Sequence, residues 1–130
     1  MTLTAAELAR LPEKPQTDGY EWTGTVGGHP CVLFGDRELT MDPGLKTLVL
    51  DNRHWSDKAS PITLGRLRRF HARIPAPGGQ FLASVYKDVG TDVTVTGQHK
   101  AKRGGWQFHA VFEVLERGDD WVRAKMLRRT

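Results

Sequence analysis

The chain has 130 residues, of which 38% are hydrophobic and 26% are charged. This composition suits one packed globular domain and excludes a disordered chain. The 19 Lys and Arg residues outnumber the 15 Asp and Glu residues, which gives a net charge of +4. This charge argues against an acidic-tail protein, but it does not by itself identify a nucleic-acid-binding protein.

The cysteine count and the hydropathy pattern narrow the class of protein further. A single cysteine excludes an internal disulfide and a cysteine-rich zinc module. No apolar run approaches the roughly 18 residues that span a bilayer, and the N-terminus lacks the segments of a secretory signal. We therefore expect a cytoplasmic protein that makes no contact with membranes.

The chain begins with the pattern of a short capped helix. Thr4 and Glu7 have the spacing of a capping box, which predicts a helix over residues 5–11, closed by Pro12. An extended segment follows. Residues 1–19 are therefore expected to form an arm that packs on the rest of the chain or on a partner.

From residue 20 onward, alternating apolar and polar residues between turn sequences predict short strands. The predicted strands cover residues 20–26, 30–34, 38–41, 45–51, 80–88, 92–97, 106–116 and 121–127. Residues 42–44 are a strong turn sequence. The strand at 106–116 places Trp106 and Phe108 on one face and Val111 on the other, so we expect it to be central and covered on both sides.

One segment between the predicted strands has a helical pattern. Pro61 suits the first helical position, and the glycines and prolines of residues 75–79 end the segment. Its apolar residues gather on one face: Leu64, Leu67, Phe70, His71 and Ile74. Its arginines gather opposite them: Arg66, Arg69 and Arg73. A strand through residues 68–74 is the competing interpretation.

Together these elements predict a mainly β fold, with α+β at the margin. We expect a single small antiparallel barrel or a strongly curved sheet of about seven or eight strands, with a short capped N-terminal helix and one helix near residues 61–74. Residues 20–130 would form one β-rich globular domain. The pattern of residues 90–97 (Gly-x-x-Val-x-Val-x-Gly), leading into a basic hairpin, resembles the later strands of oligonucleotide-binding barrels over about 30 residues.

Charge is unevenly distributed along the chain. Residues 1–57 carry five basic and nine acidic residues, a net −4, whereas residues 58–130 carry fourteen and six, a net +8. This split predicts one basic face, unless the two halves intermix in space and their charges cancel.

The densest basic segment is the expected hairpin loop at residues 98–106. Its basic residues have no acidic residue among them, so a polyanion would relieve their repulsion, and Gly104 and Gly105 would let a ligand approach closely. The alternative is a solvated hairpin tip.

The last predicted strand extends this basic region. Val122 and Ala124 make its better core face, which leaves Trp121 on the outer face beside two basic residues. An exposed aromatic among basic residues suits the stacking of bases along a charged groove, although a Trp after a turn also commonly caps a barrel end. The predicted nucleic-acid-binding residues are His99, Lys100, Lys102, Arg103, Trp106, Trp121, Arg123, Lys125, Arg66, Arg69 and Arg73.

We therefore expect a non-catalytic nucleic-acid-binding β domain that contacts the phosphate backbone, including that of single strands. Two alternatives stay open. An assembly or accessory protein, such as a phage or mobile-element component or a protein inhibitor, would dock a protein partner or a second copy through residues 1–19. A small basic metal-independent ribonuclease would use histidines as acid and base.

The histidines give this enzymatic alternative limited support. His54 beside Arg53, or His99 with His109 on an adjacent strand, could supply the catalytic groups. His71 and His109 fit structural positions better, because each lies on a partly apolar face. The pair His29 and Cys31 lacks the further ligands of a metal site. We predict no catalytic residue, no cofactor and no metal.

Overall fold

The structure is a computed structural model that describes residues 3–19, 22–42, 45–51, 61–93 and 99–130. In chain order its elements are α1 (Ala5–Ala9), β1 (Gln16–Thr17), β2 (Thr23–Val26), β3 (His29–Gly35), η1 (Asp36–Glu38), β4 (Leu39–Asp42), β5 (Leu45–Asp51), α3 (Pro61–Ala72), β6 (Gln80–Val93), β7 (His99–Arg117) and β8 (Trp121–Arg129). The fold is mainly β, as the alternation of apolar and polar residues predicts.

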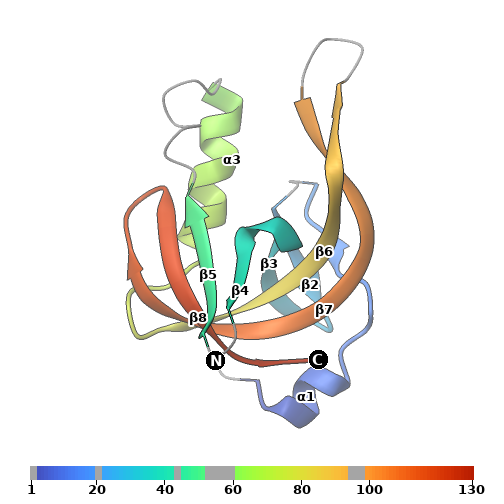
Figure 1. Cartoon of the computed structure of the whole chain (residues 1–130), viewed down its shortest axis with the longest axis vertical. Coiled ribbons are helices and arrows are strands. Elements are labelled where there is room, and N and C mark those ends of the chain that lie inside the picture. The colour runs from blue at the N-terminus through green and yellow to red at the C-terminus, as the bar shows by residue number, and fades with distance from the viewer. Residues whose placement is uncertain (1–2, 20–21, 43–44, 52–60, 94–98) are drawn as a thin grey trace.

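The strands form one curved, mixed sheet in the order β1-β2-β3-β6-β7-β8-β5-β4. Figure 1 shows the strong curvature of β6, β7 and β8. Over the described residues β1 and β4 are the edges, and the sheet does not close into a barrel.

The described strand pairs are mainly antiparallel, as expected, but the sheet is mixed because one pair is parallel. β3 and β6 run parallel, with Val32 opposite Ala83. The segment that connects these two strands contains α3 and is long enough for the crossover that parallel strands need.

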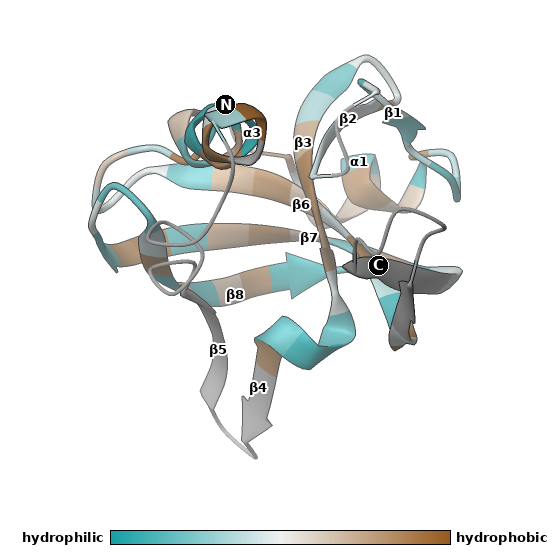
Figure 2. Cartoon of the chain, turned by 90° about the horizontal axis from the view of Figure 1, so that it is seen from above, coloured by the Kyte–Doolittle hydropathy of each residue, from teal (hydrophilic) through white to brown (hydrophobic). Residues whose placement is uncertain are grey.

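The segment after β5 that was predicted as a helix forms α3, so the helix prediction is confirmed and the competing strand prediction is wrong. Phe70 and Ile74 are buried in a cluster with Phe81 and Phe112 of the sheet. Figure 2 shows α3 beside β6. No helix in the described part of the chain is long and apolar enough to cross a membrane.

α1 has the capping box that its sequence predicts. The Thr4 backbone N–H donates to Glu7 Oε1 at 3.2 Å, and the Glu7 N–H donates to Thr4 Oγ1 at 3.1 Å. The helix ends at Ala9 rather than at residue 11.

The N-terminal arm packs on the chain's own sheet. Leu3 and Leu8 are buried in a second apolar cluster, together with Leu82 and Val111. Arg128 donates to the Leu3 carbonyl oxygen, and β1 pairs with β2. The arm therefore covers the face of the sheet that α3 leaves open.

β7 is central and covered on both faces, as predicted. Phe112 belongs to the cluster under α3, and Val111 belongs to the cluster under the arm. The expectation that Trp106 shares a face with Phe108 is wrong. A bulge shifts the register between these two residues, so Trp106 packs against the arm-side cluster.

The predicted division of residues 80–106 into two strands and a loop is also wrong. β6 runs on to Val93 and β7 begins at His99, so the predicted loop at 98–106 is mostly strand. Gly90, with a φ of +117°, lies in the register shift between Asp88 and Thr91. The pairing of β6 with β7 continues on both sides of this shift. The glycines therefore bend the strands instead of ending them.

The predicted turn at 42–44 lies largely outside the described residues. β4 and β5 pair antiparallel up to Asp42 and Leu45 on either side of it. The Gly27–Gly28 turn joins β2 and β3, and both glycines have positive φ.

Candidate nucleic-acid interface

The far ends of β6 and β7 form a two-stranded ribbon, which we define as residues 87–93 and 99–105. β3 pairs with β6 only as far as Tyr86, and β8 pairs with β7 only from Ala110 onward. Beyond these points, within the described residues, the two strands pair only with each other. Figure 1 shows the ribbon extending past the rest of the sheet. Seven residues of strand make it roughly 20 Å long.

The ribbon carries a net charge of +2 before its histidine is counted. Its charged residues are Lys87, Lys100, Lys102 and Arg103 against Asp88 and Asp92. The register places Lys100 opposite Asp92 and Arg103 opposite Asp88. The basic segment itself contains no acidic residue, but two acidic residues lie opposite it on the neighbouring strand. The net positive charge of the ribbon is therefore smaller than that of the basic segment alone.

Two residues of the ribbon that were not among the predicted site residues lie on its surface. Lys87 is exposed, and Val89 is 46% exposed. Gly104 lies against both: a Cβ there would come within 3.0 Å of Lys87 Cβ and 3.2 Å of Val89 Cγ1. The predicted strand over residues 80–88 already contained Lys87, but no local pattern marked Lys87 or Val89 as exposed.

The base of the ribbon is fixed by η1 and by aromatic packing. Asp36 of η1 accepts a hydrogen bond from the Asp88 N–H at 2.9 Å and another from Gln107 Nε2 at 3.3 Å. The rings of Tyr86 and Trp106 meet edge to face, with centroids 5.5 Å apart. Trp106 is thus a half-buried residue at the base of the ribbon.

The two predicted basic residues on the outer face of β8 each lie beside a carboxylate. Val122 and Ala124 point into the core, as predicted, and Arg123 and Lys125 are exposed. Arg123 Nε lies 2.8 Å from a carboxylate oxygen of Glu116. Lys125 Nζ lies 3.6 Å from the carboxylate of Glu113, and Trp121 is half-buried.

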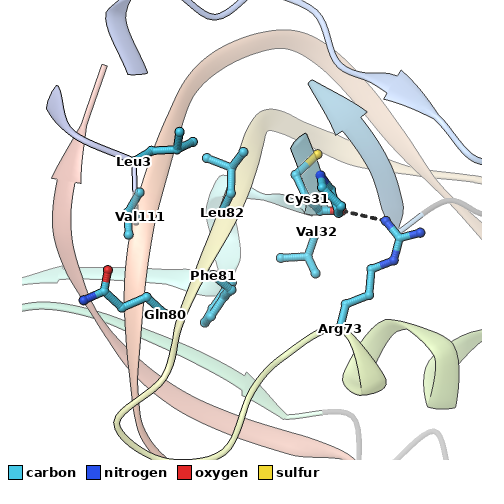
Figure 3. A pocket seen from close by; sticks show the side chains of 9 residues that line it. Leu3, Cys31, Val32, Arg73, Gln80, Phe81, Leu82 and Val111 are labelled. Atoms are coloured by element: carbon cyan, nitrogen blue, oxygen red, sulfur yellow. Dashed lines mark hydrogen bonds between the residues drawn. The ribbon is translucent and has the colours of Figure 1, made fainter. Parts of the chain in front are cut away.

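Arg73, which directly follows α3, is bound within the protein. Its Nη1 donates to the carbonyl oxygens of Gly24 at 3.0 Å and Cys31 at 3.4 Å, and its Nη2 lies 2.6 Å from the Asp18 carboxylate. These contacts tie α3 to β2, β3 and the arm. Figure 3 shows the bond to the Cys31 carbonyl.

The helix arginines and the basic residues of β8 do not share a surface. α3 packs on the face of the sheet that Val122 and Ala124 occupy. Arg123 and Lys125 alternate with these two residues along β8 and therefore face the other side of the sheet. Arg66 of the helix is half-buried, and Arg69 is exposed.

A cavity of about 380 Å³ lies near the start of β3 and β6. Figure 3 shows that its lining is mainly apolar, with Cys31, Phe81 and Leu82 near its centre and Arg73 at its edge. Burial raises the pKa of the Cys31 thiol to about 11, so the thiol is neutral and is not an activated nucleophile. The cavity contains none of the predicted binding residues except Arg73.

His109 has a structural hydrogen-bonding role. Its Nε2 lies 2.7 Å from the Pro12 carbonyl oxygen, which can only accept, so Nε2 carries the proton. In the neutral ring with this tautomer, the Ser84 hydroxyl donates to His109 Nδ1, at 2.7 Å. This chain of bonds ties the N-terminal arm to β6 and β7 and confirms the structural position predicted for His109.

The described residues do not assemble the predicted ribonuclease site. His99 and His109 lie on one strand, β7, roughly 30 Å apart along it, and not on adjacent strands. His71 is buried, as predicted, and His54 and Arg53 lie outside the described residues. No group of three or more His, Cys, Asp or Glu among the described residues could hold a metal ion.

Of the three predicted basic regions, only the ribbon stands apart from the body of the protein. The other two are divided between opposite faces of the sheet, and Arg73, Arg123 and Lys125 contact carboxylates of the same chain. Comparisons with protein families, curated proteins and solved structures found no match.

Proposed function

We propose that this protein is a non-catalytic nucleic-acid-binding β domain and that the ribbon is its binding element. The observation that carries this proposal is the isolation of a basic two-stranded ribbon from every other described strand. Phosphates that contact its lysines and arginine would release condensed counterions, which is the main source of affinity in such complexes.

The other predicted regions support the proposal less than the ribbon does. A phosphate at Arg73 would have to displace the Asp18 carboxylate and two backbone carbonyls. At Arg123 it would compete with Glu116. The ribbon, in contrast, has two more basic than acidic residues.

The N-terminal arm gives no comparable support to a protein-docking function. Its apolar residues Leu3 and Leu8 are buried against the chain's own sheet. A partner that engaged them would first have to displace the arm, which would expose the apolar cluster.

A pair of charge-matched variants tests the proposal. Lys100→Ala with Lys102→Ala removes two charges from the ribbon, and Arg123→Ala with Lys125→Ala removes two from β8. We expect the ribbon variant to bind a fluorescent duplex of about 20 base pairs at least tenfold more weakly and to reduce the salt slope by about 2, because two phosphates no longer meet a lysine.

The β8 variant should stay within about threefold of the wild-type affinity, since its two side chains already pair with carboxylates. Circular dichroism confirms that both variants are folded. Equal losses of affinity in the two variants, or no wild-type binding at about 50 mM salt, would contradict the proposal.

A further inference from the structure

The ribbon's geometry points to one class of nucleic acid: we infer that its target is B-form duplex DNA, entered through the major groove. This inference rests on the proposed function and specifies its substrate. Three observations carry it, namely the placement of the aromatic side chains, the width of the ribbon and the side chains on its surface.

The aromatic residues argue against single strands. Proteins that bind single strands stack successive bases on exposed aromatic side chains. Among the described residues, the exposed large apolar side chains are Ile62 and Val89, and neither is aromatic. Trp106 packs at the base of the ribbon, and Trp121 is half-buried. The exposed apolar side chain on the described part of the ribbon, Val89, is therefore aliphatic, which suits contact with a groove better than stacking on bases.

The width of the ribbon distinguishes between grooves. Two paired strands lie about 4.8 Å apart, and their side chains bring the ribbon to roughly 10 Å. The B-DNA major groove, about 12 Å wide, admits a two-stranded ribbon, whereas the minor groove is about 6 Å wide. The major groove of A-form RNA is deep and narrow, so the ribbon fits DNA and not duplex RNA.

The described surface of the ribbon suits this groove. Lys87 is exposed and can reach a phosphate, and Val89 presents an apolar side chain that is 46% exposed. The apolar feature of the major groove is the C5-methyl group of thymine. Lys87 and Val89 fill the space in front of Gly104, so these two side chains, and not one at residue 104, would meet the groove.

Three probes of one A·T-rich sequence test the inference with the full-length protein. They are the DNA duplex, the matching RNA duplex and one DNA strand alone, measured by fluorescence anisotropy. We expect the DNA duplex to bind at least about tenfold more tightly than the other two. Equal or tighter binding of the single strand or of the RNA duplex overturns the inference but leaves the proposed function standing, whereas no binding to any probe overturns both.

A base substitution tests the groove directly. Replacing thymine by uracil in the DNA duplex removes only the C5-methyl group, which lies in the major groove. Wild-type affinity should fall about threefold for each thymine methyl group that the ribbon touches, and Val89→Ser should bind the two duplexes equally. If the wild-type protein does not distinguish thymine from uracil, the major-groove contact is wrong. The Ile62→Ser variant is the matched control, because Ile62 is exposed on α3, and it should discriminate as the wild type does.

Discussion

Burial changes the chemistry of His71. The side chain is 2% exposed, and its ring meets Phe70 edge to face, with centroids 5.1 Å apart. Burial, and next the positive charge of Arg117, lower the pKa of His71 to about 4, against a smaller opposing effect of Asp120. His71 is therefore neutral in the folded protein at neutral pH.

This lowered pKa predicts a pH-dependent stability. An unfolded His71 takes up a proton near pH 6.5 but the folded one only near pH 4, so the free energy of unfolding falls as the pH drops through this window and falls no further below it. The decrease amounts to at most about 3 kcal/mol. Urea denaturation between pH 7 and pH 4 should show a shallower decline for His71→Gln than for the wild type. Parallel curves for the two proteins would show that His71 does not cause the dependence.

The Cys31 thiol should be protected from reagents in the folded protein. The thiol is buried, so a reagent has little access to it. Burial also raises its pKa to about 11, so little of the reactive thiolate is present. We expect a disulfide reagent at pH 8 to modify the native protein at least about 100-fold more slowly than the protein unfolded in urea. Similar rates in the two states would show that this part of the arm-side cluster is open.

At the scale of elements, Arg117 of β7 joins α3 to the sheet. The last carbonyls of a helix lack partners within the helix. Arg117 Nη1 donates to the His71 carbonyl oxygen at 2.9 Å and also to the Ile74 carbonyl oxygen. A charged donor from the sheet therefore satisfies the C-terminal end of the helix.

Removing this donor should destabilise the fold. Arg117→Ala removes the charged donor from the Ile74 carbonyl and leaves the His71 carbonyl with the Ile74 N–H alone, at 3.1 Å, so we expect it to lower the free energy of unfolding by about 2 kcal/mol in urea denaturation. Arg123→Ala removes the same side chain from an exposed ion pair with Glu116 and should cost less than about 1 kcal/mol. Similar costs for the two variants would show that Arg117 does not anchor α3.

Local sequence patterns predicted elements better than their pairing. The capping box at Thr4 and the apolar face of α3 depend on neighbours within a few residues, so both could be identified. The parallel pairing of β3 with β6 brings together residues such as Val32 and Ala83, and period-two alternation carries no information about partners. The continuous ribbon was not predicted because the predicted strands stop at residue 88 and restart at residue 92, whereas β6 runs through Gly90 at a register shift.

At the scale of the whole molecule, the fold interleaves the acidic and basic halves of the chain. β6, β7 and β8 of the basic half lie between β3 and β5 of the acidic half. Asp18 accordingly pairs with Arg73, across a sequence separation that no local pattern reveals. This interleaving divides the basic residues of 58–130 among neighbouring strands, and in the part of the chain that the structure describes the ribbon is the basic element that stands apart.

The location of binding is the central claim, and an amide chemical-shift titration tests it most directly. Uniformly ¹⁵N-labelled protein is titrated with an unlabelled DNA duplex at low salt. The largest changes should fall on amides of residues 87–93 and 99–105, and those of α3 and of Trp121–Arg129 should change little. Changes centred on α3 or on β8, or no changes at all, would contradict the claim that the ribbon binds nucleic acid.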